Sequence, residues 1–127
     1  MTKRILIIDD EEAVRKAFIL ALEDSGYQID IAKSGDSGVE KFKESNHNLI
    51  FLDLKMPKKD GVETLQELRR INKNVPIYIA TAFQGEFLDK LKAASETGLS
   101  FELLQKPIGM DKINLITKAI LEGPAKY

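Results

Sequence analysis

Five short apolar segments alternate with five longer amphipathic stretches along this chain of 127 residues, and this alternation constrains the fold more than any other feature. The apolar segments are rich in β-branched residues, which favour strands, and the stretches between them repeat apolar residues at helical spacing. Strands that alternate with helices form βαβ units, which build a parallel sheet covered by helices. We therefore predict five strands, at Arg4–Ile8, Gln28–Ile31, Asn48–Leu52, Pro76–Ala80 and Phe101–Leu104.

The residue pattern within these segments predicts the order of the strands in the sheet. The runs at residues 5–8 and 49–52 are apolar throughout, as strands buried on both faces are. The run at residues 28–31 alternates polar with apolar residues, which is typical of an edge strand. We therefore expect an α/β fold, a doubly wound five-stranded parallel sheet of order 2-1-3-4-5, flavodoxin-like and of the (βα)5 type. The length indicates one domain over residues 1–122, with 123–127 as a tail or the start of a linker.

Composition excludes several classes of protein and site. The chain has no cysteine and one histidine, which excludes disulfide scaffolds, thiol chemistry and cysteine-based zinc sites. Its 19 Lys and Arg against 20 Asp and Glu argue against direct binding of nucleic acid or of a membrane surface by bulk charge. No apolar run is longer than six residues, far too few to span a membrane. We therefore expect a cytoplasmic protein.

Local signals predict helix starts and two features of the surface. Ser37 with Glu40, and Asp60 with Glu63, both fit the capping-box pattern. His47 precedes the third strand and is interpreted as a surface histidine without a role. A solvated basic face is expected around the third helix, formed by Lys58, Lys59, Arg69, Arg70 and Lys73.

Polar residues follow four of the five predicted strands. Asp9 and Asp10 follow the first strand, Asp53 the third, Thr81 the fourth and Lys106 the fifth. Ligands of open parallel sheets bind at the carboxyl ends of the strands, at the point where the strand order reverses. This point lies between the first and third strands, so we expect the three aspartates to lie close together.

Such a group of acids has a definite chemistry. Two carboxylates about 5 Å apart repel by about 3 kcal/mol at an effective dielectric constant of about 20, so three of them require a cation. A site of oxygen ligands only, with few protein ligands, suits Mg²⁺. Asp53 then has the surroundings of a carboxylate nucleophile that forms an aspartyl phosphate. Lys106 would balance the charge of the transferred group and Thr81 would hydrogen-bond to it.

Simpler interpretations exist for each residue taken alone. Asp9 with Glu12 also fits a helix N-cap, and Asp53 before Met56-Pro57 fits a turn residue. Four polar groups at one end of one sheet are harder to explain in this way. Their joint placement therefore favours a functional site.

These residues resemble a known family, the receiver domains of two-component response regulators, over residues 5 to about 121. Asp9-Asp10 resembles the acidic pair of the family. The segment from Asp53 to Pro57, followed by Asp60-Gly61, resembles the phosphoacceptor strand end and its loop. Thr81-Ala82 resembles the switch threonine with its small neighbour, and Lys106-Pro107 resembles the lysine that precedes a proline through a cis peptide bond.

The resemblance implies a role for each of these positions. Asp53 would accept a phosphoryl group from a phosphohistidine on a sensor histidine kinase or a histidine phosphotransfer protein. The ligands of Mg²⁺ would be Asp10, Asp53 and the backbone carbonyl of Lys55, with Asp9 acting through a water. The phosphoryl oxygens would be bound by the Lys106 amine, the Thr81 hydroxyl and the Ala82 amide.

The resemblance also implies how the signal leaves the domain. Phosphorylation would draw Thr81 inward and rearrange the face formed by the fourth helix, the fifth strand and the fifth helix, which a downstream partner reads. Family members usually carry Tyr or Phe three residues before the lysine, where this chain has Leu103. Phe101 lies two residues earlier, so either residue could act in the switch.

Three functions remain open at this point. The first is a phosphoaccepting signalling domain of a phosphorelay, which catalyses only its own phosphotransfer and autodephosphorylation. The second is a pseudo-receiver that keeps the fold for protein contacts alone. The third is a phosphohydrolase of the haloacid-dehalogenase type, which expects Asp-x-Asp where this chain has Asp53-Leu54-Lys55.

Overall fold

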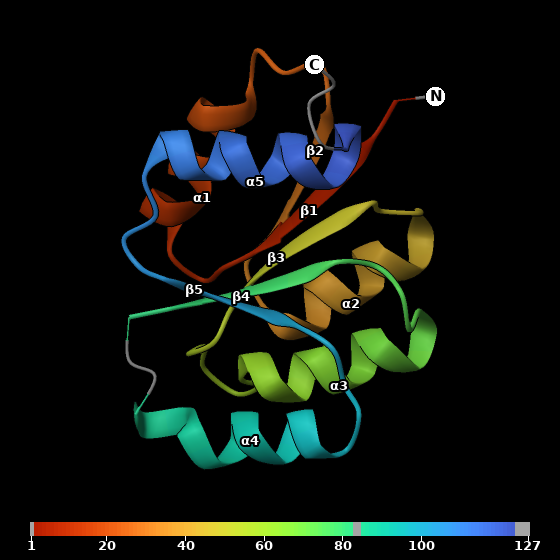
Figure 1. The fold of residues 1–127 in the computed structure, drawn as a ribbon, viewed down its shortest axis with the longest axis vertical. Coiled ribbons are helices and arrows are strands. Elements are labelled where there is room, and N and C mark those ends of the chain that lie inside the picture. Colours follow the sequence, from red (N-terminus) through yellow and green to blue (C-terminus); the bar gives the residue numbers. More distant parts are fainter. Residues whose placement is uncertain (1, 83–84, 124–127) are drawn as a thin grey trace.

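A computed structural model describes residues 2–82 and 85–123 of the chain. Strands and helices alternate along these residues as the sequence predicts, and Figure 1 shows their arrangement. The strands are β1 (Arg4–Ile8), β2 (Gln28–Ala32), β3 (Leu49–Asp53), β4 (Ile77–Thr81) and β5 (Glu102–Gln105). The helices are α1 (Glu12–Leu22), α2 (Gly35–Glu44), α3 (Gly61–Ile71), the 3-10 turn η1 (Gly85–Phe87), α4 (Leu88–Glu96) and α5 (Met110–Glu122).

The five strands form one parallel sheet of order β2-β1-β3-β4-β5, which confirms the predicted fold class. Helices α1 and α5 cover one face, and α2, α3 and α4 cover the other (Figure 1). The strand order reverses beside β1, because β2 and β3 lie on opposite sides of it. The carboxyl ends of β1 and β3 therefore lie next to each other.

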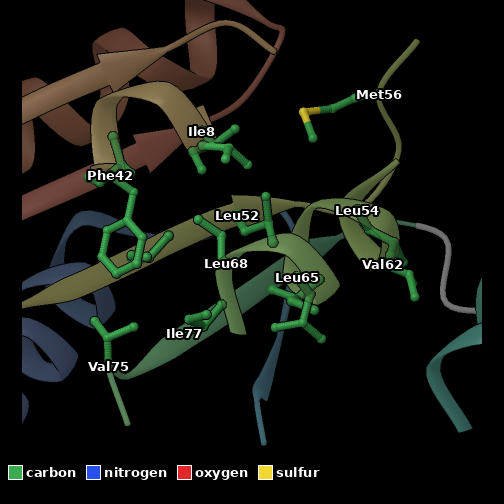
Figure 2. Close-up of a cluster of buried hydrophobic side chains, with 14 of the residues drawn as sticks. Ile8, Phe42, Leu52, Leu54, Met56, Val62, Leu65, Leu68, Val75 and Ile77 are labelled. Carbon is green, nitrogen blue, oxygen red and sulfur yellow. The ribbon is translucent and has the colours of Figure 1, made fainter. Parts of the chain in front are cut away.

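Two hydrophobic clusters hold the helices on the sheet. Successive residues of a strand point to opposite faces, so Ile5 and Ile7 pack under α1 and α5 while Leu6 and Ile8 pack under α2 and α3. Figure 2 shows part of the cluster beneath α2 and α3, in which residues of β3 and β4 meet the apolar side of α3. Because both faces of β1 and β3 are buried, residues 5–8 and 49–52 are apolar throughout.

The predicted capping box is confirmed at the start of α3 and is wrong at the start of α2. Asp60 caps α3 in a capping box with Glu63, as predicted. The predicted box of Ser37 with Glu40 is wrong, because α2 begins earlier, with Ser34 as its N-cap and Ser37 as the third helical residue. The two serines exchange the reciprocal hydrogen bonds of the box. A serine at the third helical position can therefore take the place of the usual glutamate.

The interpretation of His47 as a surface residue is wrong. Its side chain is fully buried, its ring stacks on Phe42, and its Nε2 lies 2.7 Å from Asp30 Oδ2 on β2. The carboxylate of Asp30 also lies 3.6 Å from Arg4 Nη1. A polar partner on a strand distant in sequence permits this burial, because a buried imidazole needs a hydrogen bond.

The predicted basic face is also partly wrong. Arg69 is buried and donates to the backbone carbonyls of Val75 and Ser100, so it joins α3 to two loops. Lys59 pairs with Asp36 and Glu67, which leaves fewer solvated cations on this side than expected.

Two further expectations concern the ends of the chain and membranes. The tail assigned to residues 123–127 lies, apart from Gly123, outside the described residues. No helix in the described ranges combines the length and the apolar character that a membrane crossing requires.

Candidate functional site

The backbone of the sheet places four candidate residues at one edge. Asp53 and Thr81 are the last residues of β3 and β4, so each of these strands ends one residue later than predicted. Asp9 and Lys106 directly continue β1 and β5, since the Asp9 N–H donates to Ala32 O and the Lys106 N–H donates to Thr81 O. The ladder hydrogen bonds thus fix the backbone that carries each side chain.

The three aspartates converge as predicted. One carboxylate oxygen each from Asp9, Asp10 and Asp53 lies within 4.8 Å of the others. Asp9 and Asp53 are buried, with 2% and 5% of their surface exposed, whereas Asp10 is exposed. Two of the three carboxylates are therefore buried and the third is open to solvent, and this group, whose oxygens lie close enough to share one ion, is called the hollow below.

Lys106 supplies a positive charge to this hollow. Its Nζ donates to Asp9 Oδ2 at 2.9 Å and to Asp53 Oδ1 at 3.0 Å. Burial lowers the pKa of Lys106, but the hydrogen bonds to the two carboxylates outweigh burial and raise it above its ordinary value. One ammonium group bridges two buried carboxylates. It offsets only part of the negative charge of the three carboxylates.

This excess charge perturbs Asp53. Burial and the negative charge of Asp9 raise the pKa of Asp53 to about 7, although Lys106 acts in the opposite direction. Ionised Asp53 is therefore unfavourable in the folded protein. A bound cation, alone or together with an anionic group that it accompanies, would make ionised Asp53 less unfavourable.

Asp9 is held in place by groups beyond the hollow. Its Oδ1 accepts the backbone N–H of Glu11, and its carbonyl oxygen accepts Arg15 Nη1, both at 2.9 Å. The N-cap of α1 is Glu11, without a side-chain cap, so the interpretation of Asp9 with Glu12 as a simple N-cap is wrong. Arg15 was not among the predicted site residues; its place one helical turn into the helix that follows the acidic pair was the available signal.

The turn after β3 fits tightly against Asp53. A Cβ atom on Gly61 would lie 2.5 Å from Asp53 O and 2.7 Å from Leu54 Cα, both backbone atoms. The Gly61 N–H donates to Leu54 O at 2.7 Å. Asp53 is thus the end of a buried strand rather than a turn residue, and only glycine fits at the start of α3.

The remaining predicted residues lie around the hollow. Thr81 is buried and ends the strand beside β3, and Ala82 follows it at the surface. Lys55 follows the phosphoacceptor candidate by two residues and is exposed. The peptide bond between Lys106 and Pro107 is cis, as predicted.

The two candidate switch residues differ in their surroundings. Leu103 is 42% exposed on edge strand β5. Phe101 is partly buried and packs against the hydrophobic cluster beneath α3 and α4. Which of them takes part in a switch stays a prediction.

The donor set fits a hard divalent cation. Three carboxylates offer oxygen ligands from two strand ends, and the open side leaves room for water. Mg²⁺ prefers a few carboxylate ligands completed by waters and by phosphoryl oxygens. The three carboxylates are therefore arranged so that they could hold a metal ion.

Comparison with known proteins agrees with this geometry. The family described as response regulator receiver domain matches residues 5–118. The chain is 36% identical over 121 residues to the alkaline phosphatase synthesis transcriptional regulatory protein PhoP of Bacillus subtilis, covering 95% of the chain and 49% of that protein. It is 36% identical over 118 residues to the transcriptional regulatory protein ResD of the same species, covering 93% and 48%. The chain thus spans about half the length of the curated relatives that it matches.

Solved structures share the fold over nearly the whole chain. A CheY-like receiver domain from Methanospirillum hungatei superposes with a TM-score of 0.83 at 26% identity and covers 97% of both chains. The chemotaxis protein CheY4 of Vibrio cholerae superposes with a TM-score of 0.82 at 23% identity, over 95% of this chain and all of that one. The second likeness concerns the fold alone.

Proposed function

The chain belongs to the response regulator receiver domain family of two-component systems, and from this membership and the acidic hollow we propose that Asp53 accepts a phosphoryl group. The donor would be a phosphohistidine on a sensor histidine kinase or a histidine phosphotransfer protein. A carboxylate oxygen of Asp53 attacks phosphorus, the N–P bond breaks, and its electron pair stays on the imidazole. The product is an aspartyl phosphate.

The contact of Lys106 with both Asp9 and Asp53 is the observation that carries this proposal. A partly buried ammonium group that bridges two strand ends lies where the transferred group would place its negative oxygens. The Thr81 hydroxyl and the Ala82 amide would hold the same oxygens. These three donors come from the last residue of β4, the residue after it and the residue after β5, and their positions at adjacent strand ends support this assignment.

Asp10, Asp53 and the Lys55 carbonyl would hold Mg²⁺, with Asp9 acting through a water. The ion would supply positive charge that offsets the carboxylates and the phosphoryl oxygens. Asp9 also keeps Lys106 in place through its Oδ2. The protein's own task is thus to orient the nucleophile and its cationic partner before the donor arrives.

The change at Asp53 would be passed on from Thr81 to α4. Movement of its hydroxyl toward the phosphoryl group displaces the segment that leads into α4, and the face of α4, β5 and α5 changes for a downstream partner. Leu103 on β5, or Phe101 just before it, would fill the space that Thr81 vacates. We assign this activity to residues 1–122 and expect it in the cytoplasm, without direct contact to nucleic acid or membrane.

Phosphorylation by a small donor tests the proposal. The protein is incubated with Mg²⁺ and acetyl phosphate, and its intact mass should rise by one phosphoryl group. Asp53→Asn should abolish the gain, whereas Asp24→Asn, a change at an exposed acid, should not. A wild type that gains no mass would favour the pseudo-receiver alternative.

A second measurement tests the switch. Thr81→Ala should still gain the phosphoryl group, because Asp53 and Lys106 remain. It should lose the phosphorylation-dependent change at α4, followed by amide NMR shifts. An unchanged response of α4 would contradict the role of Thr81.

A further inference from the structure

An ion pair joins α4 to the start of α3, which lie side by side in Figure 1. Lys90 Nζ donates to Asp60 Oδ2 at 2.7 Å. The Asp60 side chain is 10% exposed and that of Lys90 is 56% exposed, so the acid is the fixed partner and the lysine reaches in from the surface. Within residues 2–82 and 85–123, this is the one side-chain hydrogen bond that links α4 to the start of α3.

Asp60 is anchored to the strand that carries Asp53. Its Oδ1 accepts the Glu63 N–H at 2.9 Å, and its own N–H donates to the Glu63 side chain. The next residue, Gly61, donates to Leu54 O and packs against Asp53 O without room for a Cβ atom. The position of the Asp60 carboxylate is therefore set by the backbone at residues 53 and 54.

Helix α4 is attached less closely. It buries only Leu91 and Ala94, and a groove with a volume of about 200 Å³ runs between it and α3. It is the next α-helix after Thr81 in the chain, and the proposed function has the signal pass from Thr81 to α4. The ion pair thus joins a group held by the backbone after β3 to a helix that buries fewer residues than α3 does.

We propose that the Lys90–Asp60 ion pair restrains α4 in the arrangement in which Lys106 donates to Asp53, and that phosphorylation of Asp53 works against this restraint. The inference rests on the proposed function. A shift of α4 lengthens the distance from Lys90 Nζ to Asp60 Oδ2, because the acid does not follow. Loss of either charge therefore eases the shift.

The charge state of both partners supports a working ion pair. Burial raises the pKa of Asp60, but the hydrogen bonds from Lys90 and the Glu63 backbone outweigh burial and lower it below its ordinary value. The hydrogen bond to Asp60 raises the pKa of Lys90. Both groups are therefore charged at neutral pH.

Two substitutions and one matched control test the restraint. Lys90→Gln removes the cation, and Asp60→Asn removes the anion while the amide oxygen still caps α3. Lys92→Gln is the control, an exposed lysine of the same helix that makes no ion pair with the described residues. Acetyl phosphate is titrated in the presence of Mg²⁺, with occupancy measured by intact mass and the position of α4 by amide NMR shifts.

Lys90→Gln and Asp60→Asn should each lower the acetyl phosphate concentration for the half-maximal α4 shift by about two- to fivefold, the range for one partly exposed ion pair. The double variant should exceed neither single variant, because both remove the same contact. Salt at about 0.5 M should bring the wild type toward the variants, since it screens the pair. Lys92→Gln should follow the wild type.

The outcomes separate this inference from the function on which it rests. A wild type that gains no phosphoryl mass overturns both. A phosphorylated wild type whose titration coincides with that of Lys90→Gln overturns the restraint alone. Variants with a lower melting temperature but an unchanged titration would assign the ion pair a purely structural role, which also overturns it. If Asp60→Asn fails to fold, Lys90→Gln carries the test, since its side chain is largely exposed.

Discussion

Replacement of Asp53 by asparagine should stabilise the protein in the absence of divalent cations, although it removes the proposed phosphoacceptor. Asp53 is buried beside Asp9, and its pKa of about 7 lies well above the ordinary 3.8. The folded protein therefore holds the ionised carboxylate less favourably than the unfolded chain does. Asparagine has nearly the same shape and no charge, so it removes this penalty.

The magnitude follows from the two pKa values. The difference between 3.8 and about 7 corresponds to about 4 kcal/mol at about 1.36 kcal/mol per tenfold change in proton affinity. Water at the open side of the hollow, beside exposed Asp10, screens part of the repulsion. We therefore expect Asp53→Asn to raise the free energy of unfolding by about 2–4 kcal/mol at pH 8.

The gain should depend on pH with a definite sign. Between pH 3.8 and about 7 the folded wild type binds more protons at Asp53 than the unfolded chain does. Its stability relative to Asp53→Asn therefore falls as the pH rises through this window. The difference should be near zero below about pH 4 and complete above about pH 7.

Urea unfolding followed by circular dichroism measures this difference. The wild type, Asp53→Asn and the exposed control Asp24→Asn are compared at pH 5 and pH 8 with EDTA, and again with Mg²⁺. The control should change stability by less than about 0.5 kcal/mol, and Mg²⁺ should shrink the gain of Asp53→Asn by stabilising the wild type. A gain that is absent at pH 8, or equal at both pH values, would refute the electrostatic reasoning.

Three further substitutions test other parts of the structure by the same unfolding assay. Lys106→Met should lower the free energy of unfolding by about 3–5 kcal/mol at pH 8, because it leaves two buried carboxylates without their cation; a loss below 1 kcal/mol would contradict the bridging role. Gly61→Ala should cost at least about 1–3 kcal/mol, since its Cβ meets backbone atoms, whereas Gly85→Ala, where a Cβ meets nothing within 4 Å, should be nearly neutral. His47→Ala should lower the free energy of unfolding by about 2–4 kcal/mol, because His47 is buried. The exposed Asn46→Ala is the control, and equal losses in the two variants would contradict the burial of His47.

The sequence predicted the sheet well, because strand and helix signals are local. Apolar runs and helical spacing are repeated within each segment, and the alternation of segments leaves few topologies open. The candidate site followed from the same logic, since parallel strands bring their carboxyl ends to one edge. Asp53 and Lys106, which are 53 residues apart, meet there as expected.

The errors concern choices between equivalent local signals. Ser34 and Ser37 can each cap a helix, and the sequence alone does not show which of the two serines is the N-cap. Packing of Gly35 and Gly38 on Thr64 and Ile8 accompanies the earlier start. A glycine with no room for a Cβ cannot be recognised as such without its neighbours.

The burial of His47 and Arg69 could not be predicted from local sequence signals either. Each is a polar residue in a polar segment, and its burial depends on a partner 17 or 31 residues away. The pattern of residues was enough to place Asp53 and Thr81 within one residue of a strand end, because strand position and direction follow from short-range signals. Which charges are neutralised at close range could be read only from the folded chain, because desolvation and hydrogen-bond distance depend on contacts between segments that are far apart in the sequence.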